Sequence, residues 1–139
     1  MEKILIAEPN NFSSKALELI STRFQVIEKH ISENELSWAF ENFECFWFRL
    51  AFKIDKAILR SKKRKVFKII CPVTGLNHID TKECKNLGID VISLKGEYLF
   101  LKEIRATAEL TLALTLAILR KIPQSFDSVK KFKWNRDYF

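Results

Sequence analysis

The sequence predicts an α/β protein in which a parallel sheet of five strands lies between two layers of helices. Two observations predict this class: five short apolar runs alternate with helix-like segments, and most of these runs are nearly continuous in their apolar character. Such strands are typical of a parallel sheet covered by helices on both faces. The composition agrees, since 139 residues of which 47% are apolar and 12% aromatic suffice for the core of one domain.

The first unit lies at the start of the chain. Residues 3–7 form a short apolar run, which the polar stretch Glu8-Pro9-Asn10-Asn11 ends. Ser13 and Ser14 are suitable N-caps for a helix over residues 15–23, whose apolar residues follow helical spacing. These residues therefore predict a strand followed by a helix.

The second unit repeats this order. Residues 24–28 predict a strand. Ser32 and Glu35, three positions apart, form a capping-box pattern in front of a segment that carries Leu36 and Phe40. A second helix is therefore expected to begin there.

The remaining units follow the same pattern. The expected strands cover residues 44–50, 67–71 and 90–94. The expected helices cover residues 54–63, beginning near Asp55, and the segment from residue 78 or 80 to residue 87. With right-handed crossovers, this alternation favours a flavodoxin-like, three-layer α/β/α arrangement of the five parallel strands.

A long helix is predicted over residues 104–121, because this segment is rich in alanine, leucine and other good helix formers and Pro123 follows it. Beyond Pro123 few aliphatic residues occur, the chain ends in aromatic and basic residues, and no further periodic element that could close a core is expected. This tail is interpreted as a linker or as a segment that depends on an interface.

Several classes of site are excluded by residue counts. Only three glycines occur, at 75, 88 and 96, so the chain has neither a G-x-G-x-x-G dinucleotide loop nor a G-x-x-x-x-G-K phosphate loop. The odd number of cysteines, without a C-x-x-C pair or a signal peptide, favours a reducing, cytoplasmic location and no metal site. The longest apolar stretch, residues 110–119, is too short to cross a bilayer.

The charge is basic but uneven. Lys and Arg number 24 against 17 Asp and Glu, and residues 60–68 and 120–139 hold most of the excess. These clusters could contact phosphates, and Lys131-Phe132-Lys133-Trp134 interleaves aromatic and basic residues. Because basic residues after a helix also complement its dipole, we expect no nucleic-acid partner.

Local chemistry is sparse. Cys71 or Cys84 with His78 could form a nucleophile and base pair, but a buried, inert thiol is the more common state. Asp80 with Glu83, or Glu103 with Glu109, could act as acid and base, but Asp80 is more simply explained as a helix-start residue and Glu109 as a solvated or interfacial position of a helix.

The loop over residues 72–77 follows a strand and precedes a helix, which is where open α/β sheets bind ligands and where backbone amides can hold an anion. Gly75 would permit close approach of the main chain to a ligand, or it would simply make the turn.

Three motifs occur in a familiar order: T-G-x-x-x-I-D within ICPVTGLNHID, A-E-x-T within the long helix, and W-x-R within KWNRDYF. With the KILIAEP strand, they resemble the D-isomer-specific 2-hydroxyacid dehydrogenases, in particular members like D-3-phosphoglycerate dehydrogenase. The resemblance covers essentially the whole chain. It implies a flavodoxin-like substrate-binding (catalytic) domain and an oxidoreductase that uses NAD and a 2-hydroxy or 2-oxo acid.

The resemblance also implies roles for individual positions. Arg49 corresponds to a strand-end arginine near the substrate, although Leu50 stands where a small hydroxyl residue is usual. Val73, Thr74 and Gly75 lie where backbone amides hold the substrate carboxylate, and Thr107 lies near the nicotinamide. The catalytic Arg, Glu and His of the family have no counterparts here, so no catalytic residue is assigned.

Two hypotheses follow. In the first, residues 1–103 are the substrate-binding domain, and residues 104–139 are a helix and tail for interdomain or dimer contacts that lead toward an absent Rossmann NAD-binding domain. The isolated chain, a truncated or split form, would then be inactive and would need a complementary chain. In the second, the chain is a non-catalytic interaction or dimerisation module, docking through an apolar face of its long helix. Neither hypothesis involves a membrane.

Overall fold

The computed structural model describes residues 1–139, apart from the side chain of Arg136. It divides into two compact units, Met1–Gly96 and Glu97–Phe139. The first contains the sheet, and the second contains helices alone among its described elements.

The sheet of the first unit has five parallel strands in the order β2-β1-β3-β4-β5. The strands are β1 Lys3–Ile6, β2 Gln25–Glu28, β3 Cys45–Trp47, β4 Lys68–Cys71 and β5 Asp90–Ser93. The predicted fold class and flavodoxin-like order are therefore confirmed. The chain leaves β1 toward β2 and later returns to the other side of β1 with β3, so the order reverses between β1 and β3.

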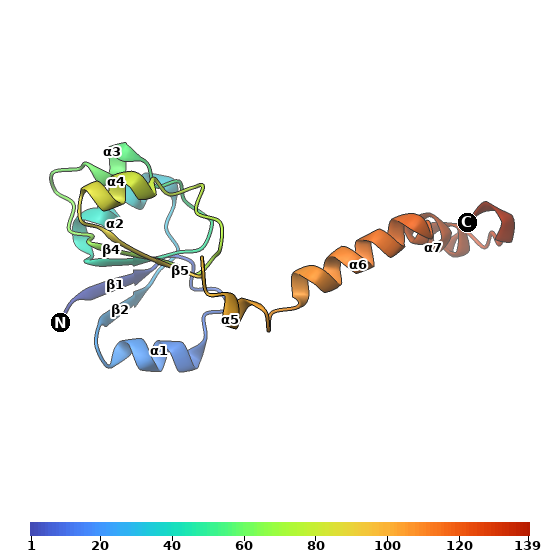
Figure 1. Cartoon of the computed structure of the whole chain (residues 1–139), viewed down its shortest axis with the longest axis horizontal. Helices are drawn as coiled ribbons and strands as arrows, with labels where there is room; N and C mark the ends of the chain where they lie inside the picture. Colours follow the sequence, from blue (N-terminus) through green and yellow to red (C-terminus); the bar gives the residue numbers. More distant parts are fainter. The chain divides into compact units, whose positions relative to one another are not determined.

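Helices cover both faces of this sheet (Figure 1). One face carries α1 Ser14–Ser21, and the other carries α2 Leu36–Asn42, α3 Lys56–Leu59 and α4 Thr81–Asn86. The caps follow from the sequence, because Ser13, Asp55 and Asp80 each accept hydrogen bonds from amides in the first turn of their helix.

The larger part of the core lies on the side of α2, α3 and α4. It is built around stacked phenylalanines, with Phe46 contacting Phe40, Phe48 and Phe52 at centroid distances of 5.2–5.9 Å. The smaller cluster lies under α1 and contains Ile4, Ile6, Cys45 and Trp47. Alternate residues of β1 and β3 therefore enter opposite cores, as a strand covered on both faces requires.

Two elements are shorter than predicted. Strand β3 stops at Trp47, because the amides of residues 49–51 turn away to bind the Glu8 carboxylate. Helix α3 has a single turn rather than the span 54–63, and Ile54 instead forms a bridge with Ile79.

Several cations of the basic segment at residues 60–68 form ion pairs or hydrogen bonds within the first unit. Arg60 pairs with Glu83 at 2.7 Å, and Arg64 donates to the carbonyls of Leu59 and Val66. Lys68 lies 3.6 Å from Asp90. Half of the six cations in residues 60–68 therefore have partners within the unit.

The second unit contains α5 Tyr98–Leu101, α6 Ala106–Leu119, α7 Ile122–Lys130 and the short 3-10 helix η2 Arg136–Tyr138. The long predicted helix is present as α6. Helix α7 was not predicted: it begins directly after Lys121, whose φ of 47° breaks the helical path, and it has no buried residue. Pro123 lies in the first turn of α7, where its missing N–H costs nothing.

Helix α6 is apolar all round rather than along one face. Its leucines at 110, 112, 114 and 116 recur every second position, which at 3.6 residues per turn places them on opposite sides of the helix. All four are more than half exposed. Among the described residues, no helix is both long and apolar enough to span a membrane.

Candidate functional site

An open groove of about 390 Å³ lies between the β1–α1 connection, α1 and the carboxyl ends of β3 and β4. This is the point where the strand order reverses, the usual ligand site of an open parallel sheet. The lining residues come from the β1–α1 connection, α1 and the ends of two strands: Asn11, Phe12, Ser13, Ala16, Ile20, Trp47, Arg49, Ile70 and Pro72.

Arg49, predicted from the resemblance, lies at the edge of this groove just after β3. Its guanidinium donates from Nη2 to the carbonyl of Asn10 at 3.2 Å and to that of Glu8 at 3.4 Å. Its Nε lies 3.6 Å from Glu8 Oε1, and the side chain is 39% exposed. The guanidinium carbon is 5.9 Å from the centre of the Trp47 ring. Arg49 is therefore held in place and still accessible.

Glu8 is the residue that sequence reasoning missed, since it was taken only as the end of a strand. Its Oε2 accepts the N–H groups of Arg49, Leu50 and Ala51 at 2.5, 3.0 and 3.3 Å. The side chain is only 18% exposed. The available signal was an acidic residue directly after the first strand, at the place where the predicted order reverses.

The loop after β4 offers free backbone donors. The N–H of Val73 already donates to the carbonyl of Cys71 at 2.7 Å, and the Val73 carbonyl accepts from Leu94 at 3.2 Å. The amides of Thr74 and Gly75 have no hydrogen-bond partner within the described part of the chain, and both residues are exposed. Of the three positions predicted to hold a carboxylate, Thr74 and Gly75 thus have donors available.

Gly75 is not required by the backbone. Its φ is outside the left-handed region that Gly88 and Gly96 occupy, and an added Cβ would meet no atom within 4 Å. Neither a tight turn nor a close contact inside the chain explains a glycine here. The space beside its backbone is open to a ligand.

Cys71 and His78 lie together beneath this edge, with Sγ 3.4 Å from Nε2. The thiol is fully buried and also lies 3.1 Å from the carbonyl of Arg49. Burial, and to a smaller extent the charge of Glu8, raises the pKa of the Cys71 thiol to about 11. The thiol therefore stays protonated and supports the Arg49 loop by donating to its carbonyl, which argues against a nucleophilic role.

The carboxylate pair Asp80 and Glu83 has a structural role. Asp80 accepts the amide of Glu83 at 3.0 Å as the cap of α4. Arg60 binds the Glu83 carboxylate and holds its pKa below the ordinary value. A lowered pKa keeps the Glu83 carboxyl ionised at neutral pH, which argues against a general-acid role for Glu83. Glu103 and Glu109 are exposed residues of the second unit.

Thr107, the predicted nicotinamide neighbour, lies in the first turn of α6, and its carbonyl accepts the hydroxyl of Thr111 at 2.8 Å. It belongs to the second unit, whereas Arg49, Val73, Thr74 and Gly75 belong to the first.

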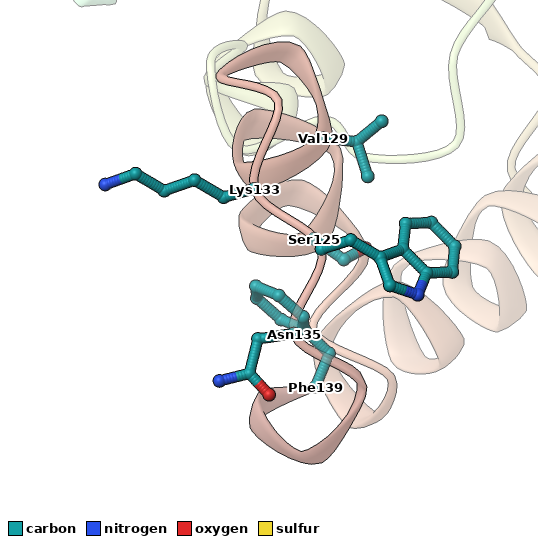
Figure 2. A pocket seen from close by; sticks show the side chains of 6 residues that line it. Ser125, Val129, Lys133, Asn135 and Phe139 are labelled. Carbon is teal, nitrogen blue, oxygen red and sulfur yellow. The ribbon is translucent and has the colours of Figure 1, made fainter.

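The second unit also has a hollow of about 200 Å³ between α7 and the tail. It is lined by Ser125, Val129, Lys133, Asn135 and Phe139 (Figure 2), together with Trp134. No cluster of three or more potential metal ligands occurs among the described side chains.

Comparison with known proteins gives one family. Residues 4–136 match the model of the D-isomer specific 2-hydroxyacid dehydrogenase catalytic domain. The D-3-phosphoglycerate dehydrogenase of Archaeoglobus fulgidus is 32% identical over 99% of this chain, which spans about a quarter (25%) of that relative.

Solved structures show the same fold. A D-lactate dehydrogenase of Aquifex aeolicus, solved with NAD and lactic acid, aligns with a TM-score of 0.74 at 21% identity over 96% of this chain and 38% of its own. An acyclic imino acid reductase, solved with NADPH and D-Arg, aligns with a TM-score of 0.77 at 22% identity over 96% of this chain and 42% of its own.

Proposed function

The chain belongs to the family of the D-isomer specific 2-hydroxyacid dehydrogenase catalytic domain, and we propose that its first unit binds the 2-hydroxy or 2-oxo acid substrate of an NAD-dependent oxidoreductase. The observation that carries this proposal is the pair of free amides at Thr74 and Gly75, on the strand edge that also carries Arg49. Adjacent backbone N–H groups at the carboxyl end of a strand suit a carboxylate.

In this proposal the substrate carboxylate accepts hydrogen bonds from the amides of Thr74 and Gly75, and the open space at Gly75 lets it reach the backbone. Arg49 contributes a guanidinium, which the carbonyls of Glu8 and Asn10 and the Glu8 carboxylate hold at the edge of the groove. Charge-assisted hydrogen bonds of this kind fix the orientation of an acid as well as its affinity. The residues of this chain thus bind and orient the substrate.

The residues present do not fit a dinucleotide by themselves. NAD-binding folds hold the pyrophosphate with a glycine-rich loop at a helix N-terminus, and the three glycines of this sequence, at 75, 88 and 96, cannot form one. We propose that a Rossmann domain not contained in these 139 residues supplies NAD, with Thr107 close to its nicotinamide. Without that domain, the 139 residues alone are expected to bind acid without turnover.

The test is a titration of the ¹⁵N-labelled chain with lactate, followed by amide chemical shifts. The expected result is a saturating shift of the Thr74 and Gly75 amides at millimolar lactate, with a smaller shift at Val73, whose amide is already bonded. Lactamide, which has the same shape without the charge, is the matched control and should leave these amides unchanged. Equal responses to both compounds, or none at Thr74 and Gly75, would contradict the proposal.

Turnover gives a second readout. The 139-residue chain, mixed with NADH and a series of 2-oxo acids, is expected to leave the nicotinamide absorbance unchanged. Oxidation of NADH at an enzymatic rate by the purified chain would refute the proposed dependence on a separate dinucleotide-binding domain.

A second function, an interaction or dimerisation module, is favoured by one specific observation. Helix α6 exposes leucines on opposite sides, and an apolar helix of this kind is normally buried. We propose that α6 is covered by a second copy of this chain or by a complementary chain. This proposal is compatible with the first, because it concerns the other unit of the molecule.

A further inference from the structure

The groove beside Arg49 has an unusual composition for a site next to a cationic residue. Six of its nine lining residues are apolar: Phe12, Ala16, Ile20, Trp47, Ile70 and Pro72. Phe12 and Trp47 meet edge to face at a centroid distance of 4.8 Å and form an aromatic wall. Pro72 begins the loop that carries the free amides, so the groove adjoins the proposed carboxylate site along the chain.

The electrostatics of the groove do not favour a second anionic group. Among its described lining side chains, Arg49 is the one with a charge, and the Glu8 carboxylate lies 3.6 Å from its Nε. The two charges together sum to zero. A phosphate carries up to two negative charges and needs cations or several free donors, which this pair does not provide.

The loop over residues 49–51, whose amides bind the Glu8 carboxylate, also favours an apolar substituent over a second anionic group. The residues after Arg49 are Leu50 and Ala51, and Leu50 is 67% exposed although its amide is fixed by Glu8. Leu50 does not line the groove itself, but it adds an exposed apolar side chain directly after Arg49, which does.

We propose that this groove receives the side chain of the substrate, and that the substrate is therefore a 2-hydroxy or 2-oxo monocarboxylate with a hydrocarbon substituent rather than a phosphorylated acid. The proposal rests on the proposed function, since the carboxylate is taken to lie on the amides of Thr74 and Gly75. The substituent extends past Pro72 and is covered by Trp47, Phe12 and Ile20.

The experiment compares three 2-hydroxy acids that share a carboxylate: glycolate, which is achiral and has no substituent on C2, and the D isomers of 2-hydroxy-4-methylpentanoate, which has an isobutyl group, and of 3-phosphoglycerate. The ¹⁵N-labelled full chain is titrated with each, and Kd is read from the Thr74 and Gly75 amides. Burial of most of an isobutyl group is expected to lower Kd about tenfold relative to glycolate. The isobutyl compound alone should also shift the indole N–H of Trp47.

A pair of phenylalanine substitutions on α1 tests the location. Ala16→Phe fills the groove and should abolish the tenfold preference for the isobutyl compound over glycolate. Leu19→Phe adds a ring on the same helix at an exposed position outside the groove and should leave the preference intact.

The outcomes separate the two proposals. Failure of all three acids to shift Thr74 and Gly75 would refute the proposed function and this inference with it. Binding of all three with equal Kd, or tightest binding of 3-phosphoglycerate, would leave the proposed function standing and overturn the inference. The ligand comparison uses the unmodified chain, so it decides the matter even if Ala16→Phe does not fold.

Discussion

At the scale of single residues, one carboxylate organises the candidate site. Glu8 binds three consecutive amides and pairs with Arg49. Glu8→Gln keeps the size of the side chain but removes its charge, so we expect the free energy of unfolding to fall by about 1–3 kcal/mol. Lactate binding should weaken as well, because Arg49 loses its support. Urea unfolding and the lactate titration measure the two effects.

The matched control is Glu18→Gln, which makes the same change on an exposed position of α1. Its unfolding midpoint should stay close to that of the unmodified chain. If both variants unfold at the same urea concentration, the hydrogen bonds of Glu8 contribute nothing measurable to stability.

Substitutions at two glycines are expected to have opposite effects on lactate binding and on stability. Gly75→Ala puts a methyl group into open space at an ordinary φ, so stability should be unchanged or slightly increased while lactate binding weakens severalfold. Gly88→Ala places a side chain at a φ of +66° and should cost about 1–2 kcal/mol without changing the Kd of the folded chain. Thermal unfolding together with the amide titration would show this crossed pattern, and parallel effects of the two substitutions would contradict it.

At the scale of elements, the capping box before α2 predicts a response to acid. Glu35 accepts hydrogen bonds from Lys29, the backbone of Ser32 and its hydroxyl, which lower its pKa to about 2. A carboxyl whose pKa is lowered in the folded state stabilises that state fully above its ordinary value of 4.5, and loses this effect as pH falls toward 2.

Glu35→Gln removes this titration. The difference in unfolding free energy between the unmodified chain and Glu35→Gln should therefore be constant above pH 5 and should shrink between about pH 4.5 and 2. Urea titrations at several pH values measure it. A difference that stays constant down to pH 2 would show that Glu35 is not paired in the folded chain.

Elements of the sheet and its covering helices could be predicted because their signals are local. Residue types that commonly cap helices mark the helix starts in the sequence: Ser13, Asp55 and Asp80, and Ser32 in its capping box. Two errors had long-range or conformational causes. The end of β3 depends on Glu8, which is 41 residues away, and α7 depends on a left-handed residue at Lys121 that no pattern of residue types announces.

The candidate site shows the same division. Arg49 and the loop at 73–75 could be named from motifs, since the motifs are contiguous in sequence. The sequence could not predict which of these amides are free, because the hydrogen bond from the Val73 amide to the Cys71 carbonyl depends on backbone angles. The groove required residues from three separate segments, and sequence alone did not show that these segments meet.

At the scale of the whole molecule, the exposed leucines of α6 predict self-association. Light scattering of the full chain at rising concentration should give a mass above that of the 16.3 kDa monomer. Leu114→Asp should shift the equilibrium toward monomer because it places a charge on the apolar surface, whereas Thr115→Asp, at the next exposed position, should have a smaller effect. A monomer at all concentrations would contradict an interface between copies of this chain.

The three buried cysteines can serve as native probes of local opening of the fold. Cys45, Cys71 and Cys84 are all buried, and burial raises the pKa of each thiol to about 11. An alkylating reagent at neutral pH therefore reacts only when the sheet or the helices above it open. Mass spectrometry of chains quenched at successive times would then give the alkylation rate of each cysteine. Cys45 and Cys71 report on the opening of two neighbouring strands, and Cys84 reports on the opening of a helix.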